Sequence, residues 1–580
     1  MSAVPPGIHV AYTLEVEKPG QPLYRVRVRA EGVSGPKVSF QLPGWTPGWY
    51  VFRGNERHLS GFSAQGPGAQ VLPVRQTEAR TWEVETQGAT SITFSYALRA
   101  SDTAFGFFEP YLDAHHGFVP GPAALTYVVG AKDAPCSITY AVPPGWQVAS
   151  ANTAVADQPS TFTAPDYDTL IDQPAELGEF LRVDRTIRGV PLSVILVGAE
   201  KLPTARWVEG VFKIAEAGIA LLGGAPFPRY VFFFHFAATE GFTGGLEHLN
   251  GTVIRLHPRA LREADAENLT LVAHEFLHAW NVKRARPAAL GPFDYTRPVR
   301  VKDLWFCEGV TDYFAPRLLV EAGLARRSFW LGYQGEQLTQ LMSNPARHLV
   351  TLEEASRKVW ESEVESEGFG GLSYYNKGLV VGLLLDIELR QRTANRVGLL
   401  ELLRALVAQC QKRGVGYAEG EIEQLASSLS GTDFGPFFAR ALRSTEELPI
   451  RETLAAGGIE AETAVARSAF LGIAWDQKGS VPGQLRISGL VEKGPALKAG
   501  LRVGDVITRF DGRPVEELQG AVLGQRQPGE TLRVTFVRGG VAQQCDLVLG
   551  VDEAWSYRLK PLSRPTAQQA GILAKISGTP

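Results

Sequence analysis

His274, Glu275 and His278 stand at the spacing H-E-x-x-H. On an α-helix, positions four residues apart return to within about 40° of the same face, so both imidazoles can reach one metal ion. Glu275 lies beside them, where its carboxylate can contact a metal-bound water. The preceding run, residues 268–273, is apolar at helical spacing. The motif therefore predicts a zinc-binding helix, and a packed pair of core histidines is the alternative.

A third zinc ligand is predicted further along the chain. Catalytic zinc usually takes three protein ligands and keeps one position open for water or substrate. Glu308 stands in a mostly apolar and aromatic run, residues 304–314, where burial of a carboxylate without a cation is costly. We predict Glu308 as the third ligand and Asp312, one helical turn later, as the acceptor that orients a ligand imidazole. A buried ion pair between Glu308 and an arginine such as Arg317 is the alternative.

Such a site can hydrolyse an amide bond. Zinc lowers the pKa of a bound water to about 7, and Glu275 takes the proton and later delivers it to the leaving amine. A phenol donor near the metal would stabilise the oxyanion that forms. Tyr375 is the candidate and Tyr374 the alternative, just before an apolar helix predicted over residues 379–389. Simple packing is the other interpretation of this tyrosine pair.

The composition argues against several classes of protein. Among the 580 residues, 58 basic and 61 acidic side chains leave a net charge of −3, which suggests neither nucleic acid nor a membrane as partner. No apolar run reaches the roughly 18 residues of a membrane span. The first residues lack a secretory signal pattern, so we expect a cytoplasmic protein by default, with export left open. The four scattered cysteines are expected to be free thiols.

Changes in the periodicity of apolar residues and in the frequency of turn residues divide the chain into domains. Short alternating runs between Gly- and Pro-rich turns predict an all-β domain over residues 1–185. Strands followed by helices predict an α+β domain over residues 186–465, a β-then-α order that matches a two-lobed domain with its active site between the lobes. Short strands return over residues 466–555, and residues 556–580 are expected to form a tail without a readable signal.

Within the α+β domain, individual elements are predicted from periodicity. Residues 190–197, 230–236 and 245–256 are predicted as strands, and residues 204–222 as a helix. Helical patterns then dominate until residues 443–466, which are predicted to be a connector.

Five motifs in order resemble one known family. They are residues 274–287, HEFLHAWNVKRARP; Glu308-Gly309 with Tyr313-Phe314; Tyr374-Tyr375-x-Lys377-Gly378; Gly244-Gly245-Leu246-Glu247-His248; and Trp45-Thr46-Pro47-Gly48-x-Tyr50. This order resembles the glycyl aminopeptidase family, PDZ-containing gluzincins that are distantly similar to the larger zinc aminopeptidases. The resemblance covers nearly the whole chain and implies a thermolysin-like fold for the α+β catalytic domain.

The resemblance also implies a role for each matching residue. One Zn²⁺ per chain would be held by His274, His278 and Glu308. Glu275 would be the general base, and Tyr375 would be the donor to the oxyanion.

Recognition of the substrate's free N-terminus is implied for Glu247. A carboxylate one residue from the scissile bond admits charged N-termini and disfavours chain interiors. Gly244 and Gly245 would let the substrate backbone approach closely. The implied activity is that of an aminopeptidase that prefers N-terminal Gly or Ala. The larger enzymes have Asn after this glutamate, whereas this chain has His248, which we expect to pack, with substrate binding as the alternative.

Two further clusters have mainly structural interpretations. Lys283, Arg284 and Arg286 are expected to be solvated or ion-paired; contact with the substrate's C-terminal carboxylate or with the acidic loop 362–367 is the alternative. The aromatic turn at residues 43–48 is expected to be a packed corner rather than a functional loop.

The last predicted domain resembles a PDZ domain. Residues 469–473 resemble the carboxylate-binding loop, and residues 494–507 resemble the turn-helix-turn of bacterial PDZ domains. In that fold a peptide adds a strand to a sheet edge, and backbone N–H groups near Gly472 would hold its C-terminal carboxylate. The expected partners are therefore peptides with a free N-terminus and a C-terminal peptide ligand at this groove. Filling of the groove by the protein's own segments is the alternative.

Two other functions stay open at this point. A zinc endopeptidase could recruit clients through the PDZ domain. A scaffold without catalysis could keep the zinc for structure and bind peptides in the PDZ groove.

Overall fold

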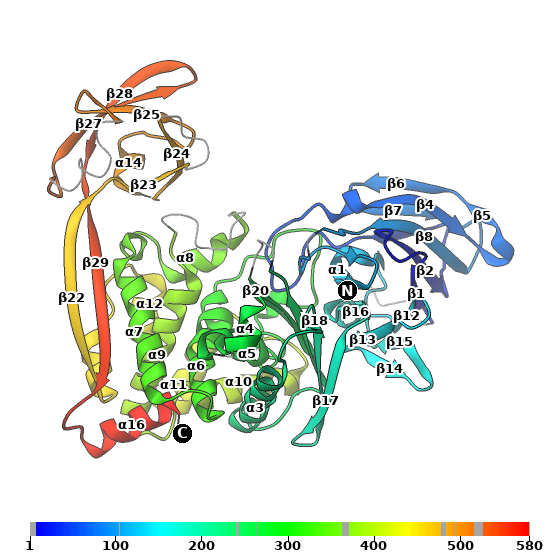
Figure 1. The fold of residues 1–580 in the computed structure, drawn as a ribbon, viewed down its shortest axis with the longest axis horizontal. Helices are drawn as coiled ribbons and strands as arrows, with labels where there is room; N and C mark the ends of the chain where they lie inside the picture. The colour runs from blue at the N-terminus through cyan, green and yellow to red at the C-terminus, as the bar shows by residue number, and fades with distance from the viewer. Residues whose placement is uncertain are drawn as a thin grey trace. The chain divides into compact units, whose positions relative to one another are not determined.

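The computed structural model describes residues 7–103, 105–238, 243–263, 265–361, 371–476, 483–491, 493–515 and 526–578. Contacts divide the chain into two compact units (Figure 1). The first comprises Met1–Val299 with Gln409–Gly416, and the second comprises Arg300–Ala408 with Tyr417–Pro580.

The first unit begins with a β-sandwich. One sheet has the strand order β14-β15-β12-β1-β2-β8-β4-β5, and the other has the order β11-β3-β7-β6. Side chains alternate between buried and exposed along strands such as β2, which is the pattern of a sheet with one face in a core. Phe40 of β3 stacks on Phe94 of β8 with ring centroids 4.6 Å apart, so aromatic side chains join the two sheets. The strands are β1 His9–Val16, β2 Leu23–Glu31, β3 Lys37–Gln41, β4 Leu59–Gln65, β5 Val71–Leu72, β6 Val74–Glu78, β7 Thr81–Glu85, β8 Ser91–Arg99, β11 Tyr127–Val128, β12 Cys136–Ala141, β14 Thr153–Val155 and β15 Gln158–Ala164.

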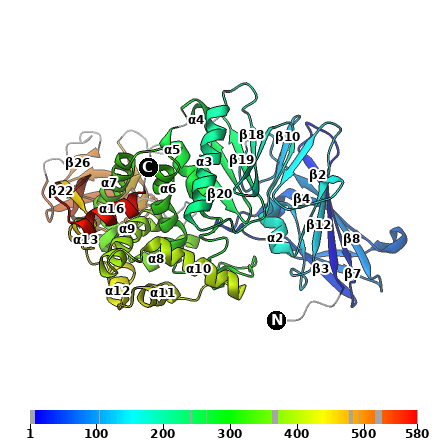
Figure 2. The same cartoon turned by 90° about the horizontal axis from the view of Figure 1, so that it is seen from below.

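A five-stranded sheet forms the centre of the first unit. Its order is β17-β18-β19-β21-β20, and its strands are β17 Leu181–Ile187, β18 Val190–Val197, β19 Tyr230–Phe236, β20 Gly244–His248 and β21 Gly251–Leu256. Every residue of β19 is buried, so both faces of the sheet are covered. Helices α3 (Ala205–Leu221) and α5 (Ala266–Leu277) cover one face (Figures 1 and 2), where Phe232 packs against Phe276.

A small four-stranded sheet covers the opposite face, with the order β13-β16-β10-β9. Phe118 of this sheet shares one apolar cluster with Val231 and Phe233 of β19. The strands are β9 Tyr111–Leu112, β10 His116–Val119, β13 Gln147–Ser150 and β16 Ala175–Gly178. Short helix α2 (Tyr167–Asp172) precedes β16.

The predicted single strand over residues 245–256 is wrong. The segment forms two antiparallel strands, β20 and β21, in which His248 pairs with Gly251. Leu249 and Asn250 make the turn, and Asn followed by Gly is a common turn signal that the surrounding apolar run obscured. This hairpin places Glu247 on β20, the edge strand of the sheet.

Helices dominate the first part of the second unit. Helix α9 (Tyr374–Arg392) is buried along nearly its whole length and contacts α6 (Val310–Glu321), α7 (Arg327–Ser343) and α8 (Leu352–Arg357). A π-helical turn, Trp305–Gly309, leads directly into α6 and also packs on α9. The other helices are α11 Glu421–Ser430, α12 Gly435–Arg443, α13 Ile450–Ala456 and α16 Ala567–Ser577, and α10 Leu399–Arg413 spans both units.

The predicted connector, residues 443–466, is wrong because it contains α13 and most of strand β22 (Ile459–Phe470). Along its whole length β22 pairs with β29 (Gly550–Pro561), and the two form a long ribbon (Figure 1). The predicted boundaries at 466 and 556 fall within these strands. The expected tail includes α16, whose Thr566 forms a capping box with Gln569.

Between the two ribbon strands the chain forms a β domain with its own core. Its sheet order is β23-β24-β25-β27-β28, and the core includes Leu471, Ile487, Leu501 and Leu532. The elements are β23 Ile473–Trp475, β24 Leu485–Leu490, α14 Pro495–Lys498, β25 Val506–Phe510, β26 Arg513–Pro514, β27 Thr531–Arg538 and β28 Val541–Val548.

All four cysteines are among the described residues, and they are free thiols, as predicted. None of the helices in the described part of the chain combines the length and apolar composition that a membrane crossing needs.

Candidate metal centre

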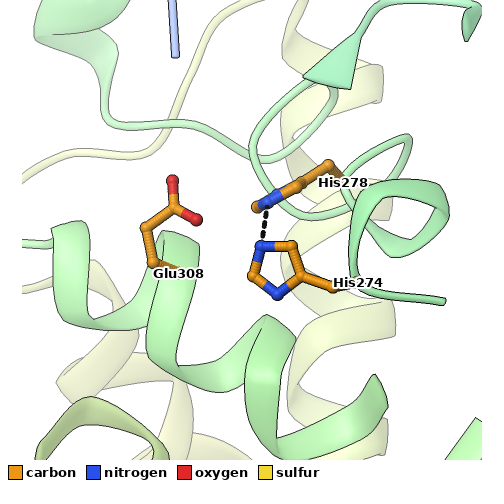
Figure 3. A group of neighbouring side chains, drawn as sticks. All are labelled: His274, His278 and Glu308. Carbon is orange, nitrogen blue, oxygen red and sulfur yellow. Dashed lines mark hydrogen bonds between the residues drawn. The ribbon is translucent and has the colours of Figure 1, made fainter. Parts of the chain in front are cut away.

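His274 lies on the last turn of α5, and His278 is the residue that caps its C-terminal end. The helix begins at Asp265, whose side chain accepts a hydrogen bond from the Asn268 N–H at 2.9 Å. His274 and His278 are both buried, and their Nε2 atoms lie 2.9 Å apart (Figure 3). The helical spacing thus brings the two ring nitrogens close enough to bind one metal ion, as the motif predicts.

The backbone of Asn281 determines which nitrogen of His278 carries the hydrogen. His278 Nδ1 lies 2.9 Å from the Asn281 carbonyl oxygen. A carbonyl can only accept, so Nδ1 donates and Nε2 keeps its lone pair, the state that a metal ligand needs. Sequence reasoning missed Asn281 and named Asp312 as the orienting acceptor. Asp312 lies partly buried in the first turn of α6, and its orienting role stays a prediction.

Glu308 joins the histidines in a single group. It is buried in the π-helical turn before α6, and π-turns are frequent at functional sites. One ligand atom from each of His274, His278 and Glu308 lies within 4.8 Å of the others, and the carboxylate is directed toward the imidazoles (Figure 3). Arg317, the alternative partner for Glu308, forms its ion pair with Glu321 at 3.6 Å.

The chemistry of this group fits zinc. Two imidazole nitrogens and one carboxylate oxygen are a common ligand set for catalytic zinc. A buried carboxylate is costly without a cation, and a divalent ion would compensate its charge. The donor state of His278 fits as well, because Nε2 has its lone pair directed into the group.

Two glycines hold the Glu308 turn against α9. A Cβ on Gly309 would lie 2.5 Å from Gly378 Cα, and a Cβ on Gly378 would lie 2.6 Å from the Trp305 carbonyl oxygen. Only glycine allows backbones to approach this closely. Tyr375 lies on the same first turn of α9 and is partly exposed, whereas Tyr374 is buried; their rings stack at 4.8 Å.

A second group shares His278 with the first. Ligand atoms of Glu247, Glu275 and His278 all lie within 4.8 Å of one another, and all three residues are buried. A Cβ on Gly245 would lie 2.4 Å from the carboxyl carbon of Glu275, so Gly245 makes room for this side chain. The approach of substrate backbone to Gly244 and Gly245 stays a prediction.

The aromatic turn of the N-terminal domain also reaches Glu247. Trp45 is buried and donates from Nε1 to the Asp294 carbonyl at 2.9 Å, as expected of a packed corner. Gly48, at φ 92°, lies against Glu247, and a Cβ there would be 2.7 and 2.8 Å from the two carboxylate oxygens. The turn therefore contacts Glu247, which the sequence did not predict.

The basic cluster after the zinc helix is mostly paired with protein groups. Lys283 is buried, and its Nζ lies 2.8 Å from Asp172 Oδ1 and 3.8 Å from Glu247 Oε1. Arg284 donates to the Leu249 carbonyl and to Asn250 Oδ1, and Arg286 lies 4.9 Å from the ring centre of Phe293. The acidic loop 362–367, the alternative contact for this cluster, lies outside the described residues.

Asp172, the nearer partner of Lys283, was not predicted from the sequence. It ends α2, 111 positions before Lys283, and no spacing signal connects the two. His248, next to Glu247, is buried as expected, and burial lowers its pKa to about 4, so the ring is neutral at pH 7.

A very small cavity lies beside Glu247. Its volume is about 20 Å³, which is room for about one water molecule. The lining residues are Trp45, Pro47, Gly48, Tyr50, Glu247, Val282, Lys283, Arg286, Leu290 and Phe293.

Three family models match the chain. The Peptidase M61 N-terminal domain matches residues 11–179, the M61 glycyl aminopeptidase matches residues 267–381, and a PDZ domain matches residues 469–549. The predicted order of a β-rich N-terminal domain, a catalytic domain and a C-terminal PDZ domain is thus confirmed.

Solved and curated proteins show likeness of different extent. The crystal structure of an aminopeptidase N family protein from Idiomarina loihiensis is 25% identical, with a TM-score of 0.80 over 97% of this chain and 100% of that chain. A protein of Neisseria meningitidis named as a zinc metalloprotease is 32% identical over 104 residues, 14% of this chain and 23% of that protein. The magnetosome formation protease MamE of Magnetospirillum gryphiswaldense is 36% identical over 66 residues, 11% of this chain and 8% of that protein. The matches thus span less than a quarter of either curated relative. Over residues 11–179 and 267–381 the chain carries both domains of the M61 glycyl aminopeptidase family, and a PDZ domain follows them.

Proposed function

We propose that the protein is a zinc aminopeptidase that removes small N-terminal residues, Gly or Ala, from peptides. One observation carries this proposal: the candidate zinc group and the carboxylate pair Glu247–Glu275 share His278. A base for hydrolysis and a carboxylate for a substrate ammonium therefore lie next to the same metal ligand.

In this proposal His274 and His278, through Nε2, and the Glu308 carboxylate hold one zinc ion per chain. When bound, zinc supplies a Lewis acid that favours ionisation of water and polarises the scissile carbonyl. Asn281 keeps the hydrogen of His278 on Nδ1, so that Nε2 stays available as a ligand.

Glu275 is the general base and acid. Its carboxylate takes the proton from the attacking water and later delivers it to the leaving amine. Gly245 allows this carboxylate to lie against the edge strand β20. The partly exposed Tyr375 donates its hydroxyl hydrogen to the developing oxyanion, and the burial of Tyr374 favours Tyr375 for this role.

Glu247 binds the α-ammonium of the substrate. A buried carboxylate makes a strong charge-assisted hydrogen bond with an ammonium, and an internal peptide segment has no such group to offer. The likeness to the M61 glycyl aminopeptidase model over residues 267–381 supports the preference for Gly or Ala.

The PDZ domain offers a second peptide site. We propose that a C-terminal peptide adds to β23, the edge strand of its sheet, with its carboxylate near Gly472.

The test compares metal-replete wild type with Glu275→Gln on tripeptides that begin with Gly, Ala or Leu, each free or N-acetylated. We expect cleavage of the free Gly and Ala peptides, little cleavage of the Leu peptide, and no cleavage of acetylated peptides. Glu275→Gln should keep its zinc and lose most of the rate.

Cleavage of acetylated peptides would instead identify an endopeptidase that recruits clients through its PDZ domain. A zinc-loaded protein without any turnover would identify a scaffold. Unchanged turnover in Glu275→Gln would overturn the role of Glu275.

A further inference from the structure

We propose that Asp172 is a positioning residue that holds Lys283, so that Lys283 does not compete with the substrate ammonium for the Glu247 carboxylate. The inference rests on the proposed function, because it assigns the partner of Glu247 in that activity.

Three charged groups are in ionic contact at this place. Lys283 Nζ lies 2.8 Å from Asp172 Oδ1 and 3.8 Å from Glu247 Oε1. Their exposed fractions are 7% for Asp172, 7% for Lys283 and 5% for Glu247. Both carboxylates are thus within reach of the same ammonium, and Lys283 lies nearer to Asp172. A buried charge is costly without a counterion, so the side chain that Lys283 pairs with decides which carboxylate a substrate ammonium can meet.

Lys283 forms its closer ion pair with Asp172 rather than with Glu247. The lysine is 1.0 Å closer to Asp172 than to Glu247 (3.8 − 2.8 Å), and the other Asp172 oxygen accepts the Leu249 N–H. Burial acts to raise the pKa of Asp172, but Lys283 and the Leu249 N–H bring the pKa below its ordinary value, so this carboxyl is ionised at neutral pH.

The backbone also holds Lys283 in place. Val282, the preceding residue, has φ 107°, a conformation that β-branched residues rarely adopt. Arg284 is directed at the Leu249 carbonyl and Asn250, and Arg286 lies over the Phe293 ring. Lys283 is thus the cation that contacts both carboxylates.

These distances imply that Lys283 and the substrate ammonium can compete for the Glu247 carboxylate. While Asp172 holds Lys283, the incoming α-ammonium meets Glu247. Without the charge at position 172, Lys283 has Glu247 as its nearest ionic partner and competes with the substrate. The chemistry at the zinc does not involve Asp172, so binding of the free amine suffers and the rate at saturation does not.

The experiment measures kcat and KM of the metal-replete full chain on a free Ala tripeptide, with zinc content and melting temperature for each variant. Asp172→Asn removes the nearer ionic partner of Lys283, and we expect a KM about 10-fold or more above wild type, with kcat within about 3-fold. Asp172→Asn/Lys283→Met also removes the competing ammonium, and its KM should return to within about 3-fold of wild type.

Asp505→Asn is the matched control. Asp505 is a buried aspartate of the PDZ domain that pairs with Arg538 at 2.7 Å and accepts the Arg502 N–H, so this change removes a similar ion pair away from Glu247. Its KM should stay near that of wild type.

The possible outcomes distinguish failure of the proposed aminopeptidase function from failure of the inference about Asp172. If wild type cleaves acetylated peptides equally well, the proposed function fails. If wild type requires the free amine but the double variant has the same high KM as Asp172→Asn, the charge relation is overturned and Asp172 is only structural. If Asp172→Asn does not fold, inhibition by glycinamide decides: Lys283→Met, which lacks the competing ammonium, should bind this small ammonium at least as tightly as wild type, and weaker binding overturns the inference.

Discussion

Glu176 Oε2 lies 2.9 Å from His235 Nε2, at the contact of β16 with β19, and both side chains are buried. Burial raises the pKa of Glu176 to about 8, with Asp113 adding to this effect and His116 opposing it. Burial lowers the pKa of His235 well below its ordinary value, and His116 and Arg255 act in the same direction. At pH 7 both groups are therefore neutral.

Glu176 should make the protein less stable as pH rises. Its folded pKa of about 8 lies above the ordinary value of 4.5, so its contribution is fully present below about pH 4.5 and lost as pH rises through about 8. Glu176→Gln replaces the neutral acid by a neutral amide. The variant should match wild type at about pH 4, begin to exceed its melting temperature by about pH 6 and exceed it most at about pH 8.5. Equal melting temperatures at the higher pH would show that Glu176 ionises without cost.

Gly378→Ala should weaken zinc binding. The added Cβ would lie 2.6 Å from the Trp305 carbonyl oxygen and 3.1 Å from Gly309 Cα, which displaces the turn that carries Glu308. Such overpacking costs about 1–3 kcal/mol, and we expect zinc affinity to fall by about 10-fold in a chelator competition. Gly382→Ala is the control, since its nearest contacts are at 3.4 Å or more. Equal affinities of both variants would contradict the role of the glycine contact.

Removal of zinc should lower the melting temperature of wild type. A ligand that binds only the folded state stabilises it by about 2.7 kcal/mol at 100 times its Kd. Glu308→Gln removes the one negatively charged ligand of the group, so its melting temperature should depend much less on zinc. Differential scanning calorimetry with and without a chelator checks this. A zinc response in Glu308→Gln as large as in wild type would exclude Glu308 as a ligand.

Gly48→Ala should impair recognition of the substrate amine. The added Cβ would lie 2.7 and 2.8 Å from the Glu247 oxygens, so the carboxylate must move. We expect KM for free Ala peptides to rise by about 10-fold with zinc content unchanged. Gly54→Ala separates displacement from backbone strain, because Gly54 also has positive φ (64°) but its nearest contact would be at 3.8 Å. A similar KM in both variants would attribute the effect to strain alone.

The metal group could be predicted because its signals are local. His274 and His278 need only one helical turn between them, and Glu308 stands out as a carboxylate among aromatic residues. Strands β18 and β19 also follow from their apolar runs and agree with the predicted residues 190–197 and 230–236.

The surroundings of Glu247 could not be predicted in the same way. Gly48 and Asp172 reach Glu247 and Lys283 through the packing of sheets that are far apart in sequence, and local periodicity carries no information on such contacts. Other misses had a readable signal. Asn250 before Gly251 marks the β20–β21 turn, and Thr566 with Gln569 forms the cap of α16.

Because the two-stranded ribbon of β22 and β29 carries the PDZ domain at its end, this domain could be exchanged for another one. Phe470 and Gly550 are register partners at the end of the ribbon, so the chain leaves and re-enters the peptidase at one point. On the peptidase side, β29 is anchored to α7 by hydrogen bonds from the Trp555 and Tyr557 N–H groups to the Ser343 and Thr339 hydroxyls, at 2.9 Å each. After deletion of residues 471–549, a short hairpin loop is therefore enough to connect the two strands. Another ligand-binding domain whose termini lie close together could be inserted at this point to give the enzyme a different binding partner.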